Sequence, residues 1–218
     1  IDRGYAKLVG FECIIQDGSG RRGYEWFGGQ APPHEALTAY GLLQFRDLSR
    51  VYPVDPVMLQ RTQAYLMSCR DGKGGFSRNA RAVDSFGGAP QDLTDAYIVW
   101  ALTESDPENK ENLDLVKEMK ALIAQSEKND DPYFNSLVAN SCFNRGMTDE
   151  GVKVLQKVKA KQSKDGSIQG AKTSITRSGG RDLEIETTAM AVLAMLKANR
   201  PDEFELSMQN AIKWIGQQ

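Results

Sequence analysis

The stretch Leu93-Thr94-Asp95-Ala96-Tyr97-Ile98-Val99-Trp100 has the composition of a buried helix, and three other stretches of the chain are variants of it. When the four are aligned on one alanine each, the intervals between them are 57, 43 and 50 residues. Such a recurrence is typical of stacked or circularly arranged helix pairs. The related stretches are Leu37–Leu43, Asn135–Cys142 and Glu186–Leu193.

Helices of a second kind alternate with these four. The segment that starts at Asp55-Pro56, and those around Leu115–Ile123, Val152–Val158 and Phe204–Ile215, are apolar on one face only. A helix that is apolar all round must be surrounded by protein, whereas a one-faced helix borders solvent. Two concentric layers satisfy both kinds, so we predict an all-α fold, an α/α toroid in the form of an incomplete ring with inner and outer helices. An open superhelix of helix pairs is the competing arrangement.

Glycine-bearing loops recur between the helices. Asp17-Gly18-Ser19-Gly20, Asp71-Gly72-Lys73-Gly74-Gly75-Phe76 and Asp165-Gly166-Ser167-Ile168 each follow a predicted helix, the first of which runs from Asp2 to Gln16. Long loops in a compact domain are often functional, so the rim that they form is the default site. Aspartate and glycine are also ordinary turn formers, and that simpler interpretation remains open for the turns themselves.

The composition is that of an ordinary globular domain, with 218 residues, 40% apolar and 26% charged. We predict a single domain over residues 1–218, truncated at both ends, because the sequence opens inside a predicted helix. With a net charge of −2 and no basic run, nucleic acid is not an expected partner. The longest apolar run, Ala189–Leu196, is far shorter than the roughly 20 residues of a membrane helix, so no membrane insertion is expected.

Few residues could carry chemistry. His34 is the only histidine and stands beside two prolines in a first helical turn, which predicts a surface position. Cys13, Cys69 and Cys142 lack metal-ligand spacing and are interpreted as structural thiols. The doublet Asp130-Asp131 precedes a proline at a helix start, where aspartates cap free amides. We therefore expect no metal, no cofactor and no enzymatic activity of the segment itself.

A toroid enzyme that acts on isoprenoids or glycans is the alternative from another class. It would need an aspartate cluster aimed at a diphosphate or an alkene, or two carboxylates facing each other at the rim. Asp84, Asp92 or Asp182 could meet that requirement only by coincidence of the fold.

The order of several motifs resembles the thioester domain of the alpha-macroglobulin and complement family. The likeness covers nearly the whole chain, and it is carried by Gly23–Gly28, His34–Gly41, Asp71–Phe76, Asp92–Tyr97 and Ile185–Ala189. The resemblance implies an α/α toroid with an internal cysteine–glutamine thioester in a Cys-Gly-Glu-Gln segment near the start of the domain. That segment does not occur in this sequence.

What the resemblance implies for function concerns the parent protein. The chain is expected to be a fragment of a secreted, extracellular or periplasmic alpha-macroglobulin-like protein with a role in innate defence. That parent would act as an endopeptidase inhibitor that traps proteases, or would tag surface nucleophiles covalently, in concert with its other domains. A binding scaffold without a thioester is a further alternative.

Three kinds of position follow from the resemblance. Asp84 stands where family members often have a histidine that directs the released acyl group to hydroxyls, so a carboxylate there predicts a preference for amines. Tyr24, Trp26 and Phe27 are candidates for an apolar screen that keeps water from the thioester, although core packing is the commoner role of aromatic side chains. Glu186 matches the glutamate of the family's Val-Glu-x-Thr pattern and is expected to be a buried, hydrogen-bonded carboxylate that positions the inner helices.

Overall fold

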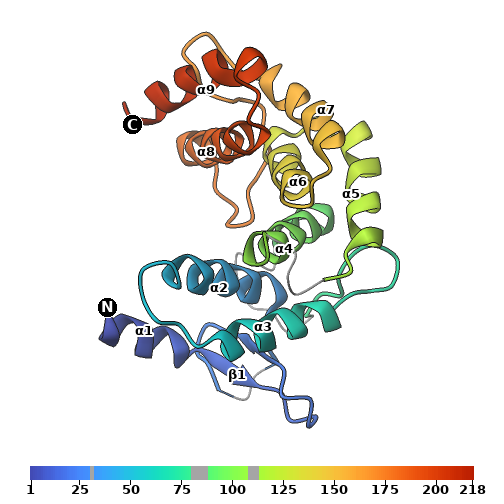
Figure 1. The fold of residues 1–218 in the computed structure, drawn as a ribbon, viewed down its shortest axis with the longest axis vertical. Coiled ribbons are helices and arrows are strands. Elements are labelled where there is room, and N and C mark those ends of the chain that lie inside the picture. Colours follow the sequence, from blue (N-terminus) through green and yellow to red (C-terminus); the bar gives the residue numbers. More distant parts are fainter. Residues whose placement is uncertain (30–31, 80–87, 108–112) are drawn as a thin grey trace. The chain divides into compact units, whose positions relative to one another are not determined.

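The computed structural model describes residues 1–29, 32–79, 88–107 and 113–218. Its described residues are mostly helical, and they group into two compact units, Ile1–Gly88 and Ala89–Gln218 (Figure 1). Nine helices and one two-stranded sheet make up the regular structure of these residues. The predicted all-α class is therefore confirmed.

Unit 1, residues Ile1–Gly88, contains three helices and the small sheet. The predicted helix from Asp2 to Gln16 is wrong in extent, because the helix ends at Val9 and a strand follows within the same segment. The strands are antiparallel, with Cys13 opposite Gly23, and they are joined by a turn in which Gly18 and Gly20 have positive φ. The elements are α1 (Asp2–Val9), β1 (Glu12–Ile14), β2 (Arg22–Tyr24), α2 (Glu35–Leu48) and α3 (Pro56–Ser68).

The hairpin is fixed to α3 by one buried carboxylate. Glu12 accepts hydrogen bonds from Arg61 at 2.6 and 2.7 Å and from Arg22 at 3.1 Å. Behind it, Tyr24, Phe45 and Met58 form the buried core of the unit, and the rings of Tyr24 and Phe45 lie 5.4 Å apart. A pair of short strands is marginal alone, so its packing against α2 and α3 holds it in place.

Unit 2, residues Ala89–Gln218, consists of two layers of helices (Figure 1). In one layer α4, α6 and α8 lie side by side, and α5, α7 and α9 pack on their outer side. Every residue of α6 from Pro132 to Cys142 is buried, whereas α9 buries only one face. This is the double layer that the alternation of helix types predicts. The bounds are α4 (Gln91–Ser105), α5 (Val116–Lys128), α6 (Pro132–Asn144), α7 (Thr148–Lys159), α8 (Gly180–Ala198) and α9 (Pro201–Ile215).

Several helix ends follow local sequence signals. Asp55 caps α3 and Asp131 caps α6, each followed by proline at the first helical position. After α6, Gly146 adopts a φ of 68°, the left-handed conformation that ends a helix. Within the described ranges, none of the helices has the length and apolar content needed to cross a bilayer.

Candidate functional site

An apolar pocket of about 220 Å³ opens on unit 1 between the end of α1, the residues after β2 and one face of α2. It contains two of the three aromatic residues that the sequence proposed as a screen, Tyr24 and Trp26. Glu25 is the one carboxylate in its lining, and the amide of Phe27 donates to Glu25 Oε2 at 3.0 Å. The pocket is lined by Leu8, Phe11, Tyr24, Glu25, Trp26, Leu37, Tyr40, Gly41, Gln44 and Phe45.

Tyr24 lines this pocket and is held by α2. Its amide donates to Thr38 Oγ1 at 2.9 Å, and its carbonyl accepts from the amide of His34 at 3.0 Å. The ring lies against Gly41, where an added Cβ would come within 2.7 Å of Tyr24 Cδ2. The side chain is only 4% exposed, and burial raises the pKa of its phenol well above the usual value. Tyr24 is therefore a core residue that also faces the pocket.

The other two aromatic residues are more exposed. Trp26 is 38% exposed and lines the pocket, while Phe27 is 91% exposed and lies outside the lining. Two positive-φ glycines, Gly28 and Gly29, follow directly. Gly28 passes so close to Gly10 that an added Cβ would lie 2.4 Å from the Gly10 carbonyl oxygen. The glycines thus let the backbone turn back after Trp26.

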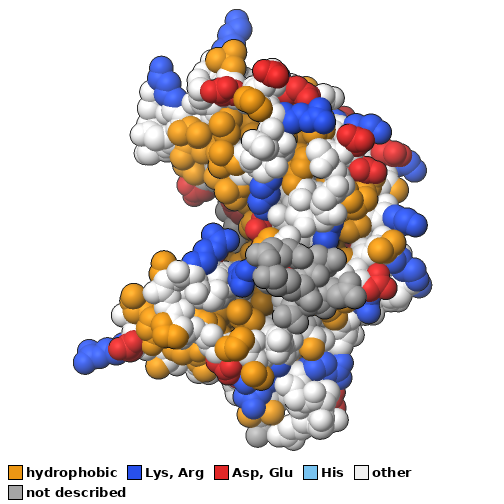
Figure 2. All heavy atoms as spheres, viewed as in Figure 1, with side chains coloured by type: hydrophobic (Ala, Val, Ile, Leu, Met, Phe, Trp, Pro, Cys, Tyr) orange, Lys and Arg blue, Asp and Glu red, His pale blue; other side chains and the backbone are white. Residues whose placement is uncertain are grey.

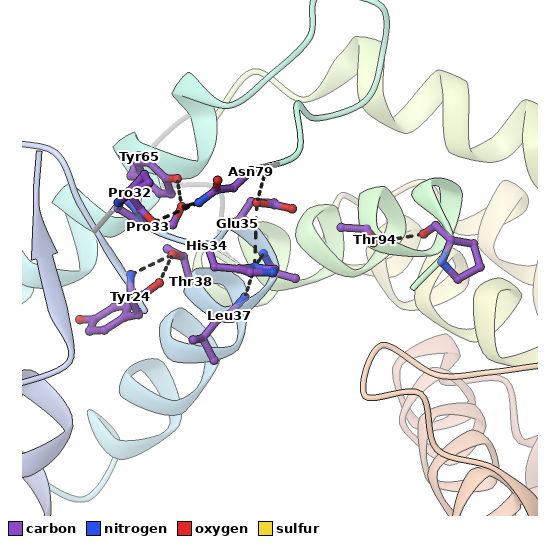
Figure 3. Close-up of polar contacts among 12 residues, drawn as sticks. Tyr24, Pro32, Pro33, His34, Glu35, Leu37, Thr38, Tyr65, Asn79 and Thr94 are labelled. Atoms are coloured by element: carbon purple, nitrogen blue, oxygen red, sulfur yellow. Dashed lines mark hydrogen bonds and ion pairs between the residues drawn. The ribbon is translucent and has the colours of Figure 1, made fainter. Parts of the chain in front are cut away.

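A cluster of polar contacts surrounds the start of α2 (Figure 3). His34 is 1% exposed, so the predicted surface position is wrong. Its Nδ1 accepts hydrogen bonds from the amides of Ala36 at 3.1 Å and Leu37 at 3.4 Å, which makes the imidazole the cap of α2. The sequence missed this role because capping is normally assigned to Ser, Thr, Asp or Asn, and an imidazole nitrogen is an unusual substitute.

Next to this cap, Glu35 and Asn79 tie the loop after α3 to α2. The amide of Asn79 donates to Glu35 Oε2 at 3.1 Å, and its side-chain Nδ2 donates to the carbonyls of Pro32 and Pro33 at 3.1 and 3.3 Å. The phenol of Tyr65 donates to the same Pro33 carbonyl at 2.7 Å (Figure 3). No sequence signal pointed to Asn79. Asp84, five positions later, lies outside the described residues.

In unit 2, Glu186 lies on α8 and is half-buried. Its Oε1 accepts a hydrogen bond of 2.8 Å from the phenol of Tyr133 on α6. Tyr133 is 1% exposed, and burial followed by the charge of Glu186 raises the pKa of this phenol well above its usual value. The carboxylate thus links two neighbouring helices of the same layer.

The glycine-bearing turns are organised by their aspartates. Asp71 Oδ1 accepts from the amides of Lys73 and Gly75 at 2.6 and 3.0 Å, and Asp17 Oδ1 accepts from Ser19 at 2.9 Å. Asp165 Oδ1 accepts from the Ser167 amide at 3.0 Å, and hydrogen bonds from Ser163 and Ser167 lower the pKa of Asp165 to about 2. These contacts are the turn-forming role that the simpler interpretation predicted.

The three cysteines form no disulfide with one another, and none is activated. Burial raises the pKa of Cys13 to about 11 and that of Cys142 to about 12, and burial also raises the pKa of Cys69. A thiol with a raised pKa is a poor nucleophile at neutral pH, because the thiolate is the reactive form. Among the described residues, no group of three His, Cys, Asp or Glu side chains is arranged to hold a metal ion.

Comparison with known proteins gives the family. The family model described as A-macroglobulin TED domain matches residues 1–218, the full length of the chain. The search among curated proteins returns no match. The match covers all 218 residues. It agrees with the two layers of helices in unit 2 and with the glycine-bearing turns that aspartates organise. The chain belongs to the A-macroglobulin TED domain family.

Proposed function

We propose that the chain is part of the thioester domain of an alpha-macroglobulin-like protein, which acts as an endopeptidase inhibitor that traps proteases or covalently tags surfaces. The observation that carries this proposal is the family match over residues 1–218. The parent protein would act outside the cell or in the periplasm. Its partners would be proteases or surface nucleophiles, together with its own other domains.

In this proposal the chain shields and positions the thioester and does not catalyse. The reactive cysteine and glutamine belong to a Cys-Gly-Glu-Gln segment that the sequence does not contain. The raised pKa values of Cys13, Cys69 and Cys142 support a non-catalytic role for these thiols. An amine nitrogen of the target would attack the thioester carbonyl carbon, and the cysteine sulfur would leave and take up the proton, which gives an amide and a free thiol.

The apolar pocket of unit 1 supports a screening role for Tyr24 and Trp26. Its lining is almost entirely apolar, which disfavours water. Phe27 is 91% exposed and would join this screen only where another part of the parent protein covers it. Glu186 is proposed to position α6 and α8 through its bond to Tyr133.

Asp84 is proposed to set the preference for amines. A histidine at this position would attack the thioester and pass the acyl group to hydroxyls, whereas a carboxylate leaves direct attack by an amine as the route. We therefore expect the parent to acylate lysine side chains of a bound protease in preference to carbohydrate hydroxyls.

The test uses the full-length parent protein. Reading its gene upstream of Ile1 comes first, since a parent without Cys-Gly-Glu-Gln cannot trap by acylation and would be a thioester-free scaffold. With the segment present, trypsin should form an adduct that survives denaturing electrophoresis, and pretreatment with methylamine should abolish it. Absence of an adduct from untreated parent would contradict the proposal.

Labelled methylamine and labelled glycerol then test Asp84. The parent should incorporate methylamine much faster than glycerol, and Asp84→His should raise the glycerol share. Asp92→His, which changes another aspartate to histidine, is the control and should leave the ratio unchanged. Equal incorporation of both nucleophiles by the unmodified parent would exclude the proposed role of Asp84 and would leave the trapping proposal unaffected.

A further inference from the structure

Basic residues are concentrated in one part of unit 2. Between Gly151 and Arg181 the sequence has eight Lys or Arg residues and one acidic residue, Asp165, although the whole chain has a net charge of −2. The lysines are separated by other residues and form no uninterrupted run. Their placement on one surface therefore depends on the fold.

Helical spacing brings three of these lysines to one face. Lys153 and Lys157 lie on α7 four residues apart, and Lys161 follows four residues later. The chain keeps turning past the end of α7, since the amide of Lys161 donates to Val158 at 2.9 Å and that of Gln162 to Lys159 at 3.0 Å. At about 1.5 Å of rise per residue, the backbone positions of successive lysines stand about 6 Å apart along this face.

Further lysines lie beside this row and just after its last member. Lys164 lies in the turn directly after the row. Lys128 and Lys172 line a shared open hollow together with Asp92, Asn129 and Asp130. The carbonyl of Asn129 accepts a hydrogen bond of 3.1 Å from Lys157 Nζ. Figure 2 shows basic side chains along the edge of unit 2 that carries α5 and α7, with acidic side chains among them. We call the following set the lysine surface: Lys128, Lys153, Lys157, Lys161, Lys164 and Lys172.

Most of these amines are not neutralised within the protein. Lys157 is engaged by Asp130 at 3.2 Å and by the carbonyls at the end of α5. The side chains of Lys153, Lys161, Lys164 and Lys172 are exposed and make no ion pair with any described residue. Like charges gathered without partners repel one another, and the potential that they create attracts an anionic polymer.

We propose that the lysine surface binds an acidic polysaccharide. Among the described residues, no large apolar side chain between Val116 and Leu193 is exposed. The surface therefore has no aromatic side chain on which nucleic-acid bases could stack, and no apolar side chain that could enter a bilayer. Spaced, exposed ammonium groups fit sulfates or carboxylates that recur along a sugar chain.

This inference does not rest on the thioester, and the experiment uses the 218-residue chain alone. Dextran sulfate and polygalacturonate are immobilised, with neutral dextran as the blank, and binding is measured by interferometry at about 50 and about 200 mM salt. The variant Lys153→Gln/Lys161→Gln/Lys164→Gln is compared with Lys7→Gln/Lys120→Gln/Lys213→Gln. Both variants lose three exposed positive charges, so only the location of the charges differs.

The unmodified chain should bind one or both acidic polymers and not dextran. The first variant should lose about tenfold or more in affinity, with a salt dependence reduced by about three charges, while the control should stay within about twofold. Circular dichroism should show the same helix content in all three proteins. Three results would overturn the proposal: no binding by the unmodified chain, an equal loss in the control variant, or tighter binding to DNA or to anionic lipid vesicles.

Discussion

The phenol of Tyr133 donates a hydrogen bond of 2.8 Å to Glu186 Oε1 and so connects the first turns of α6 to those of α8. Further along the same pair of helices, Asn140 Nδ2 donates to the carbonyl of Met190 at 3.1 Å. Polar bonds between helices that are otherwise packed through apolar side chains fix their relative register, since a shift of either helix would leave buried polar groups without partners.

The Tyr133→Phe substitution should therefore destabilise unit 2. We expect a loss of about 1 to 2 kcal/mol, because a bond to a carboxylate is removed while the half-buried Glu186 regains part of its hydration. Urea unfolding followed by circular dichroism measures the change. Tyr5→Phe is the control, since no hydrogen bond of the Tyr5 phenol appears among the described contacts, and it should change stability by less than about 0.5 kcal/mol. Equal effects of both substitutions would contradict this assignment.

Gly166→Ala tests the contact between the third glycine-bearing turn and α9. Gly166 has a φ of 103°, and an added Cβ would lie 2.3 Å from the Asn210 carbonyl oxygen. Gly170→Ala is the matched control, because its φ is 96° but no atom lies within 4 Å of the added Cβ. In both variants an alanine must adopt a positive φ, which should lower the free energy of unfolding by about 1 kcal/mol. Only Gly166→Ala should lower it by about 2 kcal/mol more, because its Cβ clashes with Asn210. Thermal unfolding of the two variants should separate them, and indistinguishable midpoints would refute the contact.

Stability should fall at alkaline pH. The pKa values of three phenols lie above the usual value near 10, mainly because the side chains are buried. These are Tyr24, Tyr65 and Tyr133. Above about pH 10 the unfolded chain releases these protons while the folded chain retains them, so the stabilisation present below that pH is lost as pH rises. Each such tyrosine contributes up to about 1.4 kcal/mol per pH unit. Tyr65→Phe should make the fall between about pH 10 and 12 shallower, and an unchanged slope would argue against a buried Tyr65 phenol.

The sequence predicted most of the helices because the two layers differ in their apolar residues. Helices of one layer are apolar on one face only, and helices of the other are apolar on nearly every side. The stretch Asn135–Cys142 mixes apolar and small polar side chains, and its helix is buried on all sides. Asp55 and Asp131 cap the helices that they precede. The hairpin was missed because Glu12–Ile14 is a short strand, and its pairing with Arg22–Tyr24 depends on contacts distant in the sequence. Gly23 shows this dependence, since an added Cβ would lie 2.5 Å from Pro33 Cβ.

The candidate site was less predictable than the helices. The family resemblance pointed to Tyr24 and Trp26 as candidates for an apolar screen, but the pocket that they share also depends on Gly41 of α2. His34 was expected at the surface, yet its ring is buried as a helix cap. Both outcomes depend on which backbone amides and ring faces come together in the fold, and a single sequence carries no signal for such pairings.

Trp26 and Phe27 should differ in their effect on the thioester of the full-length parent protein. Trp26 lines the apolar pocket, whereas Phe27 is 91% exposed and contributes nothing to its wall. If the pocket screens the thioester from water, Trp26→Ala should raise the rate of spontaneous thioester hydrolysis severalfold, because removal of the indole admits water to an apolar site. Phe27→Ala should leave the rate unchanged.

The readout is the appearance of the free thiol in the absence of any amine, followed with a chromogenic disulfide. The total thiol released by excess methylamine, measured on fresh protein, confirms that each variant starts with its thioester intact. A faster rate for Phe27→Ala than for Trp26→Ala would place the screen outside the pocket. Equal and unchanged rates in both variants would assign Trp26 to packing alone, which is the commoner role of a half-exposed indole beside a core tyrosine.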